Sequence, residues 1–408
     1  MHSVPHPASP RRLLSVDVLR GLVMFIMLLV NDLAGVDHLP MWLKHFEPPL
    51  ANGMTFVDVV FPAFLFVVGV SIPLAVDSRR DRGLTTRSTL LHIFARSLSL
   101  LLLGVIMVNF RGWGPWPVLA LFASLAAFLH IGSFPRWTNA SLRVLGFLAL
   151  ACLILAYPRF NPDHSFHPQW WGILGLIGWA YLIGAVMYLA AGKSRPALIT
   201  ALALLIALYY ASVQTTFINL PSYLSLFGVS LSAYINIGAH LGSHSAIAVA
   251  GVILGTSLLP GSPESRATRP HVARCRFALL FALGLALAAL LTYPSFGVNK
   301  NLATPAWSLL SAALTTLLFI PTYLLTDAPP RRPRSLSLFT QCLSLLGAAA
   351  LMAYLLQPLF FRALSALNLP YNLLAPTTPL AILRALTFAT LLSALAILLH
   401  RKHIRLKL

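Results

Sequence analysis

A polar stretch near the start of the chain, LKHFEPPLANGMTFVDVVFP (residues 43–62), lies between two long apolar runs. It contains His45, whose imidazole exchanges protons near neutral pH, as a general base or a transient nucleophile must. It also contains Asp58, which follows Thr55 by three residues at the start of an apolar run. That spacing is typical of a capping box at a helix N-terminus, and it equally directs a carboxylate toward the loop with His45. Two interpretations therefore stay open: a solvated histidine beside a helix cap, or an acid–base pair.

The apolar run before this stretch carries polar residues at both of its ends. Asp17 and Arg20 are three residues apart, so on a helix they share a face and can form an ion pair. The alternative is that Arg20 faces a cavity and binds an anionic ligand. Asn31 follows Arg20 by eleven residues, about 16 Å along a helix, so this one helix marks both ends of a potential passage. Asp32 is expected to be a solvated helix end.

Two later stretches also gather polar side chains. IGAHLGSHSAI (residues 237–247) places His240 and His244 one helical turn apart, a spacing that metal ligands use. No third ligand is evident, so no metal site is predicted, and ligand contact and local helix capping remain as alternatives. FGVNKNLATPAWS (residues 296–308) offers several hydrogen-bond donors and one cation: Asn299, Lys300 and Asn301.

The whole chain is strongly apolar. Of its 408 residues, 58% are hydrophobic and 10% are charged, and the mean hydropathy is +0.80; soluble proteins have about 25% charged residues. This composition predicts an all-α polytopic membrane protein whose first partner is the lipid bilayer. The net charge of +19 is explained by Lys and Arg in cytoplasmic loops, so no nucleic-acid partner is predicted. The three cysteines lie on separate apolar runs and show no metal-binding spacing.

Apolar runs of about 20 residues cross a bilayer as helices, and they predict a bundle of about twelve spans here. The predicted spans are 13–34, 56–76, 90–110, 117–134, 141–157, 171–191, 196–213, 245–260, 275–293, 306–326, 338–361 and 380–399. Of the 29 Lys and Arg residues, 21 fall in segments on the side of the N-terminus, 5 on the other side and 3 inside spans. Because Lys and Arg collect in cytoplasmic loops, both termini are predicted to be cytoplasmic. Residues 1–408 then form one membrane domain: a tail at 1–12, the bundle at 13–399 and a basic tail at 400–408.

Several of these stretches together resemble a known family. SVDVLRGLVMFIMLLVND, the following KH, NGMTFVDVVFPAFLFVVGVSI, and NKNL with a downstream Trp-Ser pair are similar to motifs of the heparan-α-glucosaminide N-acetyltransferase family of transmembrane acyltransferases. The resemblance implies that the acetyl group of cytoplasmic acetyl-CoA passes to an amino sugar or glycan on the far side of the membrane. It also implies that His45 is the catalytic residue, with Asn31 and Asp58 as its neighbours in the active site.

Binding residues are also predicted for each of the two substrates. The residues predicted to bind acetyl-CoA are Arg20, Arg96, Asn299, Lys300 and Asn301. The residues predicted to bind the acceptor are Asn52, His240 and His244. Where the family has a compact HxxWNG link after the histidine, this chain has HFEPPLANG, which is longer and lacks the tryptophan. The acceptor side is therefore where this chain departs from the family pattern.

The expected chemistry has two routes. Asn31 holds the thioester carbonyl and stabilises its developing negative charge, while Asp58 orients the imidazole and stabilises its cationic form. His45 then either deprotonates the acceptor or carries the acetyl group itself. The sequence does not choose between them.

Other classes of function stay open as well. Twelve spans with both termini inside is also a layout of secondary transporters, here for a small anionic or sugar-like solute, with Asp17, Arg20 and Arg384 on a proton or anion path. A non-catalytic scaffold is the third class. The expected location is the cytoplasmic (inner) membrane of a bacterium, and a homodimer is left open.

Overall fold

The computed structural model describes residues 13–111, 114–168, 170–213, 225–226, 229–230, 234–328, 334–367, 371 and 377–408. The tail predicted at 1–12 lies outside the described residues. The elements in chain order are α1 (Leu14–Leu33), η1 (Met41–Leu43), α2 (Val57–Asp81), α3 (Thr86–Val108), α4 (Pro115–Phe128), β1 (Leu129–Ile131), α5 (Arg136–Leu155), α6 (Tyr157–Phe160), α7 (Gly172–Ala191), α8 (Arg195–Val213), β2 (Ser225–Leu226), β3 (Val229–Ser230), η3 (Ile237–Ser243), α10 (His244–Thr256), α11 (Pro263–Arg266), α12 (Pro270–Phe296), α13 (Pro305–Thr326), α14 (Arg334–Ala348), α15 (Ala350–Ala366), α16 (Thr378–Arg401) and β4 (Ile404–Leu406).

The predicted all-α polytopic membrane fold is confirmed. Within the described residues, ten helices are long and apolar enough to cross a bilayer, and an eleventh span results if the bent pair α14 and α15 counts as one. Each of the twelve predicted spans contains helix, but the run predicted at 117–134 is helical only to Phe128 and continues into the strand β1 (Leu129–Ile131). The run predicted at 117–134 is the weakest, because its helix α4 has only 14 residues.

Two other predicted spans differ from the structure. The run 338–361 is not one straight span, since α14 and α15 meet at an angle of 76°. A Cβ on Gly347 would lie 2.1 Å from the carbonyl oxygen of Asp17, so the end of α14 is pressed against α1, and the chain turns directly after this contact. The run 245–260 begins earlier, with the π-helix η3 at Ile237, and the helix ends at Thr256. A hydropathy pattern does not show the bend between α14 and α15, and it does not detect the polar beginning of the helix at η3.

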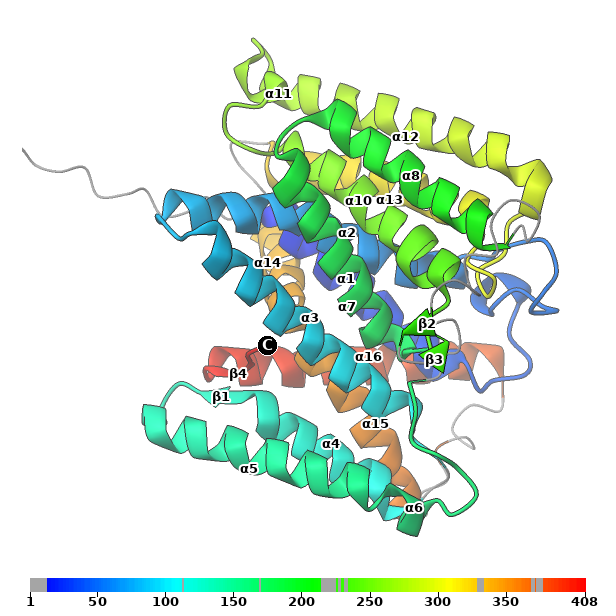
Figure 1. Cartoon of the computed structure of the whole chain (residues 1–408), viewed down its shortest axis with the longest axis vertical. Helices are drawn as coiled ribbons and strands as arrows, with labels where there is room; N and C mark the ends of the chain where they lie inside the picture. The colour runs from blue at the N-terminus through cyan, green and yellow to red at the C-terminus, as the bar shows by residue number, and fades with distance from the viewer. Residues whose placement is uncertain are drawn as a thin grey trace, which may run out of the picture.

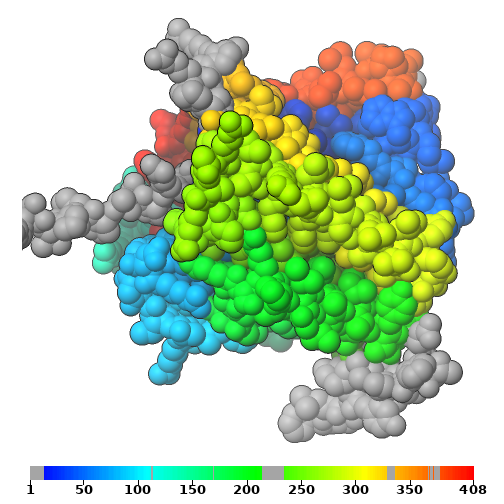
Figure 2. All heavy atoms as spheres, turned by 90° about the horizontal axis from the view of Figure 1, so that it is seen from above, coloured from blue at the N-terminus to red at the C-terminus, as the bar shows by residue number. Residues whose placement is uncertain are grey.

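The most enclosed helix is α10, which packs among α2, α7, α8 and α13 (Figure 1). In the most apolar segment of η3 and α10 together, 89% of the residues are buried, against 22% in α12. Most leucines of α12 are exposed instead, as Leu280, Leu287 and Leu291 are. In Figure 2, α12 and α8 lie side by side across the face turned to the viewer. A helix that is apolar all round needs protein or lipid on every side, and α10 is surrounded by protein whereas α12 requires lipid.

Glycines bring α2 and α10 into close contact. A Cβ on Gly69 would lie 2.0 Å from the carbonyl oxygen of Ala248, and a Cβ on Gly251 would lie 2.1 Å from the carbonyl oxygen of Phe66. Both obstacles are backbone atoms, so only glycine fits at these positions, as at other close helix crossings in membranes. This contact fixes α2, and with it Asp58, against the core of the bundle.

Replacing Gly251 with Leu is expected to force α2 and α10 apart and to prevent formation of the native bundle. The measurement is the yield of monodisperse protein on size-exclusion chromatography, together with its melting temperature. Gly284→Leu on the lipid-facing helix α12 is the matched control, since an added Cβ there meets nothing within 4 Å. Equal behaviour of the two variants would contradict the close packing.

The loop between α1 and α2 lies at one end of the bundle, called here the His45 end. The opposite end, called the Arg20 end, holds the starts of α1 and α3 and the antiparallel pair β1–β4, with the C-terminus beside them (Figure 1). The basic tail predicted at 400–408 is thus partly a strand, since Ile404–Leu406 pairs with Leu129–Ile131. Which end faces the cytoplasm stays a prediction.

Candidate active site

The Asp58 carboxylate lies in the first turn of α2, and its side chain is 2% exposed. Its Oδ2 atom accepts hydrogen bonds from the backbone N–H groups of Phe46 (3.1 Å) and Thr55 (3.0 Å). Its Oδ1 atom lies 2.8 Å from Nδ1 of His45. The contact with the helix start and the contact with the histidine are therefore both present, on different oxygens of one carboxylate.

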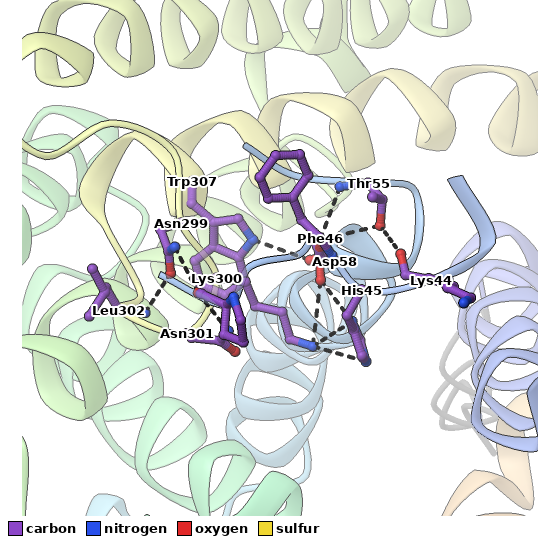
Figure 3. A network of polar contacts seen from close by, with 11 residues as sticks. Lys44, His45, Phe46, Thr55, Asp58, Asn299, Lys300, Asn301, Leu302 and Trp307 are labelled. Carbon is purple, nitrogen blue, oxygen red and sulfur yellow. Dashed lines mark hydrogen bonds and ion pairs between the residues drawn. The ribbon is translucent and has the colours of Figure 1, made fainter. Parts of the chain in front are cut away.

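This contact fixes the orientation of His45 (Figure 3). A carboxylate only accepts, so Nδ1 is the ring nitrogen that carries the proton and Nε2 has the free lone pair. The His45 side chain is 52% exposed and lines a cavity at this end of the bundle. An aspartate that holds the Nδ1–H of a half-exposed histidine is the arrangement that acid–base triads use.

Lys300 completes a cluster with these two residues (Figure 3). Its Nζ atom lies 3.7 Å from Oδ1 of Asp58, and 3.0 Å and 3.3 Å from Nδ1 and Nε2 of His45. An amine bonded to one ring nitrogen in the plane of the ring would be much farther from the other, so Nζ lies against the ring face. Burial in the loop between α12 and α13 lowers the pKa of Lys300, and the Asp58 carboxylate opposes that shift.

The NKNL segment holds the loop that carries His45. Asn299 is 4% exposed, and its Nδ2 atom donates to the carbonyl oxygens of Pro49 (3.0 Å) and Ala51 (2.7 Å). Asn301 also donates to the carbonyl oxygen of Pro49, at 2.8 Å. The inserted Pro-Pro segment is therefore fixed by the second motif of the chain. Asn299 and Asn301 were predicted to bind acetyl-CoA; the structure gives both a contact with this loop.

Asn52 is held by the end of α12. Its Nδ2 atom donates to the hydroxyl of Tyr293 (2.7 Å), and its Oδ1 atom accepts from the backbone N–H of Val298 (2.8 Å). Asn52 is not among the described residues that line the cavity. Its predicted role in acceptor binding stays a prediction, while its structural role is to close the loop onto α12.

Replacing Asn299 with Ala is expected to loosen the His45 loop, because the carbonyl oxygen of Ala51 loses its side-chain donor and that of Pro49 keeps only Asn301. The loss of such buried hydrogen bonds costs about 1–3 kcal/mol of folding free energy. Limited trypsin digestion should cut faster after Lys44 in this variant than in the wild type. Asn161→Ala, in the loop after α6, is the control and should leave cleavage at Lys44 unchanged. Unaltered cleavage in Asn299→Ala would contradict the proposed anchoring.

The cavity at the His45 end has a volume of about 690 Å³. Its lining combines polar groups and aromatic rings: Asn31, His45, Asn236, His240, His244, Lys300, Asn301, Phe61, Trp170, Tyr234 and Trp307. Trp307 also donates through Nε1 to the backbone carbonyl of Asp58, at 3.2 Å. Exposed aromatic rings beside amides and a cation are suited to a polar ring-shaped ligand.

His240 and His244 lie inside this cavity wall, in a helix and not in a loop. The Nδ1 atom of His244 is 2.7 Å from the carbonyl oxygen of Ala239, so Nδ1 donates and Nε2 keeps its lone pair. The buried Nδ1 of His240 has no hydrogen-bond partner among the described residues. His240 lies in the π-helical segment η3, a feature frequent at functional sites, and His244 is the first residue of α10. In the described part of the chain, no group of three His, Cys, Asp or Glu side chains is placed to hold a metal.

A second cavity of about 750 Å³ lies toward the Arg20 end. The lining groups that can meet an anion are Arg20, Ser71, His92, Arg96, Arg405 and Lys407. Arg20 lies 3.1 Å from Asp17 and donates to Ser71 at 2.5 Å, so it forms the predicted ion pair and lines the cavity as well. Arg96 lies over the ring of Tyr181, 5.0 Å from its centroid. The two residues predicted to meet acetyl-CoA phosphates thus line one cavity.

One face of α1 lines both cavities. Arg20 and Met24 line the cavity at the Arg20 end, Asn31 lines the cavity at the His45 end, and Met27 lines both. Their spacing follows the helical repeat, so the four side chains form one stripe. The prediction that this helix marks both ends of a passage agrees with that arrangement.

The expectation for Asp32 is wrong. Asp32 is buried, with its Oδ2 atom 3.1 Å from Nε of Arg384 and its Oδ1 atom 2.6 Å from the hydroxyl of Tyr371. Arg384 is 7% exposed and does not line either cavity described above. A buried charge without a partner is strongly destabilising, and the partner of Asp32, Arg384, is far away in the sequence.

Sequence reasoning also missed the residue that holds Asn31. Gln357 on α15 accepts a hydrogen bond from Nδ2 of Asn31 (2.9 Å) and donates to the carbonyl oxygen of Leu28 (3.0 Å). The signal was present, since Gln357 is an amide within a long apolar run, and such residues usually face a partner.

Comparisons with known proteins place the chain in a family. Residues 12–235 match the family model described as domain of unknown function (DUF5009). The chain belongs to this family. It is also 39% identical over 102 residues to the heparan-alpha-glucosaminide N-acetyltransferases of Homo sapiens and Mus musculus. Homology to these proteins confirms the resemblance predicted from the motifs. The match covers 25% of this chain, and only 14% and 15% of the human and mouse proteins.

Proposed function

We propose that this member of the DUF5009 family is a transmembrane acetyltransferase. It transfers the acetyl group of acetyl-CoA, bound in the cavity at the Arg20 end, to an amino sugar or glycan in the cavity at the His45 end. The observation that carries this proposal is that His45, paired with Asp58, lines one cavity, while the same face of α1 also lines a second, separate and cation-rich cavity. The homology to N-acetyltransferases supports the type of reaction.

His45 supplies the base. Its Nε2 lone pair takes the proton of the acceptor amine or hydroxyl as that group attacks the thioester carbonyl carbon, and it then gives the proton to the departing thiolate. A C–N or C–O bond forms and the C–S bond breaks. In the second route, Nε2 attacks the carbonyl carbon itself, an Nε2–C bond forms as the C–S bond breaks, and coenzyme A leaves as its thiolate. The acceptor then attacks the acetyl carbon, the Nε2–C bond breaks, and the released Nε2 takes the proton of the acceptor. Asp58 stabilises the cationic imidazole in both routes.

Two groups that line the same cavity as His45 are suited to the developing negative charge. Lys300 places a cation within 3.3 Å of both ring nitrogens. Asn31 is held by Gln357 through one N–H of its amide, which leaves the second N–H for an oxyanion. Preorganised donors and cations of this kind usually supply the largest part of the rate enhancement in acyl transfer.

The cavity at the Arg20 end suits the phosphates of coenzyme A. Arg20 and Arg96 lie in its wall, and Arg405 and Lys407 join them from the C-terminal strand. Arginine binds phosphate oxygens through two parallel N–H groups. The basic loops favour a cytoplasmic position for this end, in the inner membrane of a bacterium, and the acceptor then lies on the opposite side.

His45→Ala is expected to lower acetyl transfer by about a thousandfold or more, because the variant loses its general base or nucleophile. The measurement is transfer from labelled acetyl-CoA to glycans in membranes that contain the variant. His38→Ala, an exposed histidine of the same loop, is the control and should keep wild-type activity. Near-normal transfer by His45→Ala at equal expression would refute the assignment.

Acetyl-CoA is expected to raise the melting temperature of the purified protein, since a ligand that binds the native state stabilises it. Arg20→Ala and Arg96→Ala should each need more acetyl-CoA for the same rise, because each removes a phosphate partner. Arg159→Ala at the other end of the bundle should respond like the wild type. No response of the wild type, together with solute uptake into proteoliposomes, would favour the transporter alternative.

A further inference from the structure

The two cavities are separate, and the wall between them is thin. Among the described lining residues, Met27 of α1 and Ile173 of α7 are the two that belong to both cavities. Met27 is 3% exposed, so its side chain fills the space between them. Ile173 is partly buried and packs against the core.

The third wall of the passage is α2. Val57, Val60 and Phe61 face the cavity at the His45 end, whereas Phe64, Val68 and Ser71 face the cavity at the Arg20 end. The two cavities thus meet between Phe61 and Phe64 on α2, at the level of Met27 on α1. Met27, Ile173, Phe61 and Phe64 are all apolar, so these four side chains offer no partner to water or to an ion.

We propose that Met27 and Ile173 form the barrier that the acyl thioester crosses to reach His45, and that they determine which acyl groups are accepted. This inference rests on the proposed function. A thioester that is bound by its phosphates near Arg20 reaches the His45 cavity only by displacing this wall. The acyl group is the end of the acyl-CoA molecule that reaches the wall first, so its size determines whether the thioester can pass.

Met27 and Ile173 differ in side-chain flexibility, and a barrier that opens needs this difference. Methionine is unbranched and has three rotatable bonds, so the Met27 side chain can move aside. Isoleucine is branched at Cβ and is stiff about χ1, so Ile173 is the fixed side of the opening. A small acetyl group passes with a movement of Met27 alone, whereas a longer acyl chain requires the fixed side to move as well.

The first test is acyl selectivity. Transfer from acetyl-, propionyl- and butyryl-CoA to labelled glycan is measured for the wild type and for Met27→Ala. The ratio of butyryl to acetyl transfer should rise about tenfold or more in Met27→Ala, the scale on which a methylene-sized steric limit discriminates. Leu19→Ala is the matched control, since Leu19 is a buried residue of the same helix that lines neither cavity. A ratio within about twofold of the wild type in Met27→Ala would overturn the proposal.

A variant that enlarges the side chain separates the effect on the opening from a folding defect. Met27→Trp should lower acetyl transfer about tenfold or more by narrowing the opening, while acetyl-CoA still raises its melting temperature. Ile173→Ala should relax the selectivity in the same direction as Met27→Ala. Normal acetyl transfer by a folded Met27→Trp would also overturn the proposal.

The second test does not depend on activity. In a chain whose cysteines Cys152, Cys275 and Cys342 are replaced by alanine, Asn31→Cys and Ser71→Cys each place one thiol in one cavity. A charged, membrane-impermeant thiol reagent should reach Asn31→Cys from one face of sealed vesicles only, and Ser71→Cys from the opposite face only. Adding Met27→Ala should let the reagent reach Asn31→Cys from both faces.

The outcomes separate the two proposals. If the wild type transfers no acyl group but the labelling is one-sided, the proposed function fails and the barrier stands without a role in acyl choice. If Asn31→Cys is labelled equally from both faces while Met27 is intact, the barrier fails, whatever the activity is.

Discussion

A carboxylate at the start of a membrane span has to find partners within the protein, since lipid offers none. Asp58 finds them in three separate segments: the loop with His45 and Phe46, the turn at Thr55, and the loop with Lys300. Each partner must be in place for the charge to be compensated. The carboxylate therefore binds these segments into one unit, and Trp307 adds α13 by donating to the Asp58 backbone carbonyl. The fold and the candidate chemistry depend on the same side chain.

The three acidic residues of α1 and α2 discussed above show how the surroundings of a charge separate structure from function. Asp32 and Arg384 are enclosed together, with side-chain exposures of 0% and 7%, so neither can change partners without exposing a buried charge. Arg20, paired with Asp17, is 21% exposed and lines a cavity, so a ligand can reach it. Asp58 is buried while its partner His45 is 52% exposed. That asymmetry gives a histidine that is fixed on one side and accessible on the other.

Much of this arrangement could be predicted from the sequence, because it follows from local spacing. The apolar runs predicted the positions of the helices, and the Thr55–Asp58 spacing predicted a carboxylate at the start of a helix. The spacing of eleven residues from Arg20 to Asn31 predicted that one helix reaches both ends of a passage. What could not be predicted are contacts between segments distant in sequence: the Asp32–Arg384 pair, the support of Asn31 by Gln357, and the anchoring of Pro49 by Asn299. Each of these contacts depends on which segments of the chain lie next to each other in the fold. A hydropathy pattern contains no information about that arrangement. The bend between α14 and α15 escaped for the same reason, since it follows a contact with α1.

The strand pair at the Arg20 end has a consequence for the order of assembly. β1 follows α4 early in the chain, and its partner β4 comes after α16. During synthesis the hairpin of α4 and α5 must therefore enter the membrane and wait, with the edge of β1 unpaired, until all later spans have been inserted. Because β4 also brings Arg405 and Lys407 to the wall of the cavity, the cation-rich cavity is complete only at that moment. A nascent chain that has already joined His45 to Asp58 thus still lacks part of this wall.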